Sequence, residues 1–281
     1  MTTETGNQAT RGTFGHDGID IPYEVRGAGE PLVLIHGGIG QIEVWEPVAD
    51  DLARTHRVFA YDQRGHGSST VKGTPDLRVH RDDLAAFIEQ VVGGPATLIG
   101  WSGGGGVGLP LALDRPELVT HLILMEGVFY LRIPNWEALK AMLRFQRVIR
   151  KRPDDAVTDF MRLMFAYRTG VTAWDEISEE VRQLLLGDAR GLESKLRLHR
   201  YGGHMEWVKA RDVAKCPVPM TWVGGEESIE FFQKMHGKLA AANSNLKTVM
   251  IPSENHAFPV VDPTAFASVV RELTGATTRT S

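Results

Sequence analysis

The sequence predicts an α/β protein in which a mostly parallel sheet is covered by helices and carries one helical insertion. Short strand-like runs alternate with amphipathic stretches of helix length, which is the pattern of strand–helix–strand units. This alternation stops between Val128 and Asp212, where we find helical patterns and no strand pattern. With 281 residues, 42% of them hydrophobic, the chain can form one large core together with this insertion.

The strands are expected in two groups. Residues 13–15 and 19–26 read as an antiparallel hairpin, because the Asp-Gly pair at 17–18 between them favours a tight turn. The later runs are short and rich in apolar residues, as expected for a parallel sheet covered on both faces. These runs are residues 31–35, 57–61, 96–100, 121–125, 218–223 and 247–251.

Helices are expected between these strands and in the insertion. Those between strands are residues 44–54, 78–92, 103–114, 229–242 and 263–273. In the insertion, Ser178 before two glutamates is typical of a helix start. Apolar residues there would form two helix faces: Trp136, Leu139, Met142 and Phe145 on one, and Met161, Met164, Phe165 and Tyr167 on the other. We therefore expect an α/β core at 1–127 and 213–281, with a helical cap at 128–212.

Composition and charge restrict the possible partners. The net charge is −4 with both signs interspersed, which does not suit a nucleic-acid surface. The single cysteine, Cys216, excludes an intramolecular disulfide and fits a reducing compartment. The polar N-terminus lacks the apolar stretch of a signal peptide, and no apolar run is long enough to span a membrane. We expect a cytoplasmic protein without a nucleic-acid or membrane partner, and the sequence does not indicate an oligomeric state.

A candidate nucleophile lies at the end of one expected strand. Residues 100–104 read Gly-Trp-Ser-Gly-Gly, a G-x-S-x-G motif between an apolar strand and an apolar helix. A sharp strand-to-helix turn of this kind raises the central serine above the sheet and points the next backbone N–H at a substrate oxyanion. Ser102 is thus the candidate nucleophile, and Gly103 is a candidate oxyanion donor.

The same glycines also match a different motif. Gly103, Gly105 and Gly108 spell G-x-G-x-x-G after a strand, and Glu126 follows at the spacing of a ribose-binding acid. This interpretation would make the protein a dinucleotide-dependent oxidoreductase. We disfavour it because the loop lies far from the N-terminal strand that usually carries it, and because it leaves the other motifs unexplained.

Two of these other motifs complete a hydrolytic site. Residues 36–40 read His-Gly-Gly-Ile-Gly directly after a strand, where the N–H of Gly38 could form an oxyanion hole with that of Gly103. Of the ten histidines, only His256 lies at a late strand end with a helix to follow. His256 is therefore the candidate general base.

Together, the segments HGGIG, DQRGHGSS, GWSGG and NHAF resemble the α/β-hydrolase superfamily over nearly the whole chain outside the cap. The resemblance implies a serine hydrolase of that fold with no cofactor. The chain contains no H-E-x-x-H motif and no clustered Cys and His ligands, so we expect no metal site.

Two residues are candidates for the triad acid. The superfamily commonly places an aspartate in the turn after the next-to-last strand, but here Ser228 stands at that position, and Glu227 would have to substitute from a shifted register. Glu126 instead closes the apolar run at 122–125, whose strand should neighbour that of the nucleophile. A carboxylate on so apolar a strand is costly unless it is paired, and we therefore favour Glu126.

A serine nucleophile with a glutamate at this place is similar to the zearalenone lactonases, which open resorcylic macrolactones. Segments 222–235 and 251–270 resemble that group, as does cap segment 193–207, although the group lacks the histidine found here at position 36. The resemblance implies a Ser102–Glu126–His256 triad, with Trp207 and His204 as substrate-binding residues. The expected function is hydrolysis of a carboxylic ester, specifically a bulky apolar lactone. The alternatives are a generic carboxylesterase and a small-molecule receptor without turnover.

Overall fold

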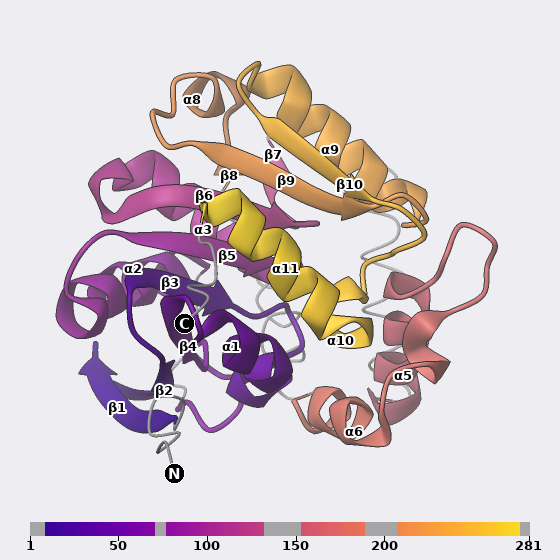
Figure 1. Cartoon of the computed structure of the whole chain (residues 1–281), viewed down its shortest axis with the longest axis horizontal. Helices are drawn as coiled ribbons and strands as arrows, with labels where there is room; N and C mark the ends of the chain where they lie inside the picture. Colours follow the sequence, from indigo (N-terminus) through magenta and orange to yellow (C-terminus); the bar gives the residue numbers. More distant parts are fainter. Residues whose placement is uncertain (1–8, 71–76, 132–152, 189–206, 276–281) are drawn as a thin grey trace, which may run out of the picture.

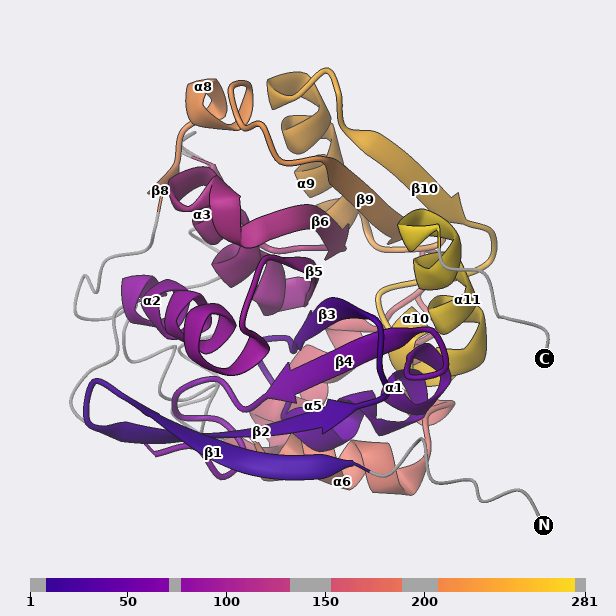
Figure 2. The same ribbon diagram turned by 60° about the vertical axis from the view of Figure 1, so that its left-hand side comes forward.

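The structure, a computed structural model, describes residues 9–70, 77–131, 153–188 and 207–275. An eight-stranded sheet runs through it in the order β1-β2-β4-β3-β5-β6-β9-β10 (Figures 1 and 2). Its strands are β1 (Thr10–His16), β2 (Ile19–Arg26), β3 (Glu30–Ile35), β4 (His56–Tyr61), β5 (Ala96–Trp101), β6 (Val119–Met125), β9 (Met220–Gly225) and β10 (Lys247–Ile251). This is the α/β-hydrolase fold that the sequence predicted.

The sheet opens with an antiparallel hairpin and continues as parallel strands. Strands β1 and β2 form the predicted hairpin, with Asp17 and Gly18 both at positive φ in its turn. Strand β2 also pairs antiparallel with β4, and the pairs from β4 to β10 are all parallel. Because parallel strands share one direction, the loops after β3, β5, β6, β9 and β10 all begin at the same edge of the sheet.

Helices cover both faces of the sheet. In Figure 2, α2 and α3 lie on one side and α1, α10 and α11 on the other. Alternate residues of β3 accordingly belong to two separate apolar clusters, with Val33 in one and Leu34 in the other. The helices are α1 (Glu46–Leu52), α2 (Leu77–Phe87), α3 (Gly105–Asp114), α5 (Pro153–Met164), α6 (Glu179–Gly187), α8 (Ala210–Val213), α9 (Glu230–Ala242), α10 (Phe258–Val261) and α11 (Pro263–Thr274).

Three of the expected helices differ locally from the prediction. A 3₁₀ turn at Ile42–Trp45 precedes α1, and another at Ser102–Gly104 precedes α3. Helix α2 continues as a π-helical turn over Ile88–Val92. The hydrophobic pattern marks only the buried face of such a segment, so it does not distinguish the helix types.

The insertion contains one feature that the sequence did not indicate. Strands β7 (Tyr130–Leu131) and β8 (Trp207–Val208) form a short parallel pair, which is too brief to leave an alternating pattern. Helices α5 and α6 lie in the described part, and Ser178 caps α6 by accepting a hydrogen bond from the N–H of Val181. The expected helix face at 136–145 lies outside the described residues.

Candidate active site

The strand-to-helix turn after β5 holds Ser102 in a strained conformation. Its φ is 51°, a left-handed value that costs a residue with a side chain on the order of 1–2 kcal/mol. A Cβ on Gly104 would lie 2.2 Å from the carbonyl oxygen of Ile35, so only glycine fits there. The half-buried Ser102 thus stands at a sharp turn that the small residues around it make possible.

The glycine loop after β3 lies directly against this turn. A Cβ on Gly103 would lie 2.8 Å from the nitrogen of Gly38, and one on Gly37 would lie 3.3 Å from the Cβ of Ser102. The structure therefore brings together the two expected oxyanion donors and the expected nucleophile. Two backbone N–H groups at such a place can stabilise the negative charge of a tetrahedral intermediate.

His36 orients the peptide group of this loop. Its Nε2 accepts a hydrogen bond from the N–H of Gln63 at 3.0 Å, so the ring proton is on Nδ1, which donates to the carbonyl of Gly37 at 2.9 Å. In a trans peptide the carbonyl and the following N–H point in opposite directions, and the described chain contains no cis peptide. Fixing the carbonyl of Gly37 therefore directs the N–H of Gly38 away from His36.

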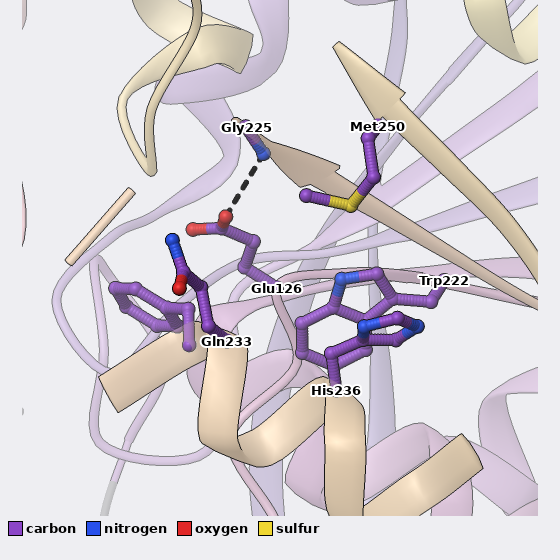
Figure 3. Close-up of a pocket in the computed structure, with 7 residues that line it drawn as sticks. Glu126, Trp222, Gly225, Gln233, His236 and Met250 are labelled. Carbon is purple, nitrogen blue, oxygen red and sulfur yellow. Dashed lines mark hydrogen bonds between the residues drawn. The ribbon is translucent and has the colours of Figure 1, made fainter. Parts of the chain in front are cut away.

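His256 and Glu126 form a buried pair, although they are 130 residues apart in the sequence. The Nδ1 of His256 lies 2.9 Å from Oε2 of Glu126, and the two residues are only 2% and 1% exposed. The other carboxylate oxygen, Oε1, accepts a hydrogen bond from the N–H of Gly225 at 3.0 Å (Figure 3). With the Nδ1 proton directed at the carboxylate, Nε2 is left to accept a proton.

The local backbone turns Glu126 towards the histidine. Its φ is 44°, so the chain bends sharply just after β6. Its N–H still donates to the carbonyl of Val223, which keeps the bend fixed to β9. The N–H of Val128 donates to the carbonyl of Ser102 at 2.7 Å, which ties this bend to the nucleophile turn as well.

Glu227, the rival acid, does not reach the histidine. Its hydrogen bonds among the described residues involve its backbone: its N–H donates to Glu254 and its carbonyl accepts from Arg168. Ser228 is buried in the same turn, which is fixed by its own N–H donating to Gly225. The geometry therefore places the carboxylate of Glu126, and not that of Glu227, beside His256.

Aromatic rings enclose His256 on several sides. Phe232 of α9 stacks on the imidazole with a ring distance of 3.9 Å and an interplanar angle of 19°. The indole N–H of Trp101 donates to the carbonyl of His256, and the ring of Phe165 lies 6.1 Å from the imidazole. The sequence does not indicate a role at the site for Phe165 and Phe232, because aromatic residues at helical spacing indicate only a buried face.

A cavity of about 240 Å³ lies on the α9 side of the acid (Figure 3). It is lined by Glu126, Trp222, Gly225, Phe232, Gln233, His236 and Met250. Trp222, Phe232 and Met250 supply the apolar part of this lining, and Gln233 and His236 add polar groups near the carboxylate.

Some expected contacts are not made within the described residues. No hydrogen bond joins the hydroxyl of Ser102 to His256, and such bonds often close only when substrate is present. His204 lies outside the described residues, and Trp207 is described only as a backbone position in β8.

The same described ranges contain no group of three His, Cys, Asp or Glu side chains that could hold a metal ion. Nor do they contain a helix long and apolar enough to cross a membrane.

The dinucleotide interpretation does not agree with this geometry. Both oxygens of Glu126 are engaged, by His256 and by Gly225, so it is not free to bind a ribose. A Cβ on Gly105 would lie 2.5 Å from Cα of Gly127, which shows that this glycine allows helix α3 to pack against the bend after β6. The glycines serve close packing within the fold.

Comparison with known proteins finds sequence matches over part of the chain. Residues 30–152 match the family model described as the alpha/beta hydrolase fold. An uncharacterized hydrolase of Bacillus subtilis, YraK, is 31% identical over 53% of this chain and 56% of its own length. A pimeloyl-[acyl-carrier protein] methyl ester esterase of Nitrosomonas europaea is 32% identical over 41% of this chain and 45% of its own. The chain thus spans about half the length of the curated relatives it matches.

Solved structures match over nearly the whole chain. The epoxide hydrolase CorEH has a TM-score of 0.79 at 19% identity, covering 95% of this chain and 99% of its own. Est816, described as an N-acyl homoserine lactone degrading enzyme, has a TM-score of 0.77 at 20% identity, with 93% and 99% covered. The enol-lactonase from Burkholderia xenovorans has a TM-score of 0.76 at 18% identity, with 94% and 100% covered. These solved structures and the matching family model show that the chain has the α/β-hydrolase fold.

Proposed function

We propose that this protein is a serine hydrolase that cleaves carboxylic esters by acyl transfer. Ser102 is the nucleophile, His256 the general base and Glu126 the acid that orients the base. Gly38 and Gly103 donate to the oxyanion. The observation that carries the proposal is the buried His256–Glu126 pair beside a turn that holds Ser102 at positive φ.

The reaction proceeds in two balanced steps. Nε2 of His256 takes the hydroxyl proton of Ser102 as the Ser102 oxygen attacks the ester carbonyl carbon. The resulting oxyanion accepts hydrogen bonds from the backbone N–H groups of Gly38 and Gly103. Collapse breaks the bond to the alcohol oxygen, which takes the proton from His256 and leaves an acyl-enzyme. Water then attacks the acyl carbon while His256 accepts its proton, and collapse returns that proton to Ser102.

The proposed substrate is a bulky apolar lactone such as zearalenone. Its support is the similarity of the Ser102–Glu126–His256 arrangement to the zearalenone lactonases. Aromatic side chains around His256, including Phe165 from segment 153–188, provide an apolar environment of the kind that favours large ring systems. Two solved structures with this fold bear the names of lactone-acting enzymes. We further propose that residues 128–212 form the cap over the site, with Trp207 and His204 in contact with substrate.

Turnover of matched substrates tests this proposal. We expect kcat/KM for zearalenone, measured by chromatography of the ring-opened product, to be well above that for p-nitrophenyl acetate. Trp207→Ala is expected to lower the rate mainly for the large substrate. Faster turnover of the short ester would reduce the proposal to a generic carboxylesterase. Binding of zearalenone without turnover of any ester would favour a receptor and contradict the enzymatic proposal.

A further inference from the structure

A buried carboxylate links segment 153–188 to the oxyanion loop. Asp188 directly follows α6 and is 4% exposed. Its Oδ2 accepts a hydrogen bond from the N–H of Gly40 at 2.9 Å. The same oxygen lies 2.6 Å from Nδ1 of His66. Its Oδ1 accepts from the N–H of Gly67 at 2.9 Å. The three partners are between 121 and 148 residues away in the sequence.

The position of these partners relates the carboxylate to the proposed chemistry. Gly40 is two residues from Gly38, in the loop that follows β3. The ring of His66 lies edge-on to that of His36 at 4.9 Å, and His36 orients the peptide that carries the N–H of Gly38. Asp188 therefore holds both the far end of the oxyanion loop and a neighbour of the histidine at its near end.

We propose that Asp188 is a positioning residue that makes the oxyanion hole depend on the docking of α6. When α6 is in place, the carboxylate holds the N–H of Gly40, and the N–H of Gly38 stays directed at the developing oxyanion. Without α6 in this position, the loop would lack this acceptor. This inference rests on the proposed function, because it assigns Asp188 a role in the same acyl-transfer site.

The physical basis is the sensitivity of an oxyanion hole to geometry. Removing one donor outright typically lowers kcat by about 10²–10³-fold. A loosened donor still binds, so losing its anchor should lower kcat by less, roughly 10- to 100-fold. The ground-state ester carbonyl carries little charge, so KM should change little.

Asp188→Asn tests the proposal with minimal change in shape. The amide keeps one acceptor oxygen and puts an NH₂ group where the other oxygen was, so at least one backbone N–H loses its acceptor. We expect kcat to fall roughly 10- to 100-fold with KM within about threefold of wild type. Inhibition by phenylboronic acid, whose adduct with Ser102 would place an oxygen in the oxyanion hole, should weaken by a similar factor.

Asp175→Asn is the matched control. Asp175 lies in the same segment, and its carboxylate forms an exposed pair with Arg162 that does not reach the oxyanion loop. Loss of an exposed pair has little effect on stability, so kcat and boronate affinity should stay at wild-type values. A rise in KM at unchanged kcat in Asp188→Asn would indicate a substrate-binding role and overturn the inference.

Amide hydrogen exchange of the wild-type protein supplies a test that does not depend on a folded variant. We expect the amides of Gly40 and Gly67 to exchange slowly, as buried hydrogen-bonded amides do. Exchange at the rate of an exposed loop, or wild-type kcat in Asp188→Asn, would overturn this inference while leaving the hydrolase proposal in place. Absence of any ester turnover in the wild-type protein would instead overturn the proposed function.

Discussion

Glu126 combines two features that are individually costly. It adopts a positive φ, and its carboxylate is buried next to an apolar strand. Both are offset by its hydrogen bonds: one oxygen pairs with His256 and the other accepts the N–H of Gly225. A side chain held so firmly keeps the imidazole in one orientation and one tautomer, which is what a general base requires.

Replacing each candidate acid in turn tests this role. We expect Glu126→Gln to lower kcat by about 10⁴-fold, as the isosteric change of a triad acid can do, because the amide neither fixes the tautomer nor stabilises the imidazolium. Glu227→Gln is the control and should retain near-wild-type kcat. Steady-state kinetics of both variants measure the difference. If Glu227→Gln were inactive and Glu126→Gln kept wild-type kcat, the triad acid would instead be Glu227, in the turn after β9.

At the scale of elements, helix α9 packs against His256 and borders the cavity beside Glu126. Phe232 is 1% exposed, stacks on His256 and lines the cavity beside Glu126. Its neighbour Phe231 is 37% exposed, so one turn of α9 offers a buried and an exposed phenylalanine for comparison.

These two phenylalanines give a matched prediction. Phe232→Ala should lower the free energy of unfolding by about 3–5 kcal/mol, the usual loss for a buried phenylalanine. It should also lower kcat, because His256 loses the ring that restricts it. Phe231→Ala should change the free energy of unfolding by no more than about 1 kcal/mol. Denaturant unfolding and ester kinetics of both variants provide the check, and equal effects of the two substitutions would contradict this role for Phe232.

At the scale of the whole molecule, the central sheet contains a histidine that couples stability to pH. Burial lowers the pKa of His121 in β6, with a further contribution from nearby Lys247. Its Nε2 lies 2.9 Å from Oγ1 of Thr221 in β9. The unfolded chain therefore takes up a proton more readily than the folded protein, and this contribution to stability is lost as pH falls below about 6.5.

His121→Gln should reduce that pH dependence. We expect the free energy of unfolding of the wild-type protein to fall more between pH 7.5 and pH 5.5 than that of the variant. Comparing each protein with itself at two pH values cancels the other titrating groups they share. Identical pH dependence in the two proteins would show that His121 does not contribute.

Much of the fold follows from local patterns in the sequence. Apolar runs and turn residues predicted the eight strands of the main sheet, because buried parallel strands leave continuous apolar segments. Strand order predicted that the strand ending at Glu126 lies beside the nucleophile strand, and the structure pairs β6 with β5 and places Glu126 beside His256. Contacts such as Asp188 with Gly40 leave no local signal, because they depend on how distant segments pack. The same holds for the stacking of Phe232 on His256.

The proposed mechanism depends on Ser102 as the nucleophile of a buried triad. Its most direct test is covalent labelling with a fluorophosphonate probe, measured together with kcat. We expect wild type to be labelled at Ser102, and Ser102→Ala to be unlabelled with kcat lower by about 10⁶-fold. Ser228→Ala, which changes a buried serine in the turn after β9, should label as wild type does. Equal labelling of wild type and Ser102→Ala, or retained activity in that variant, would contradict the account.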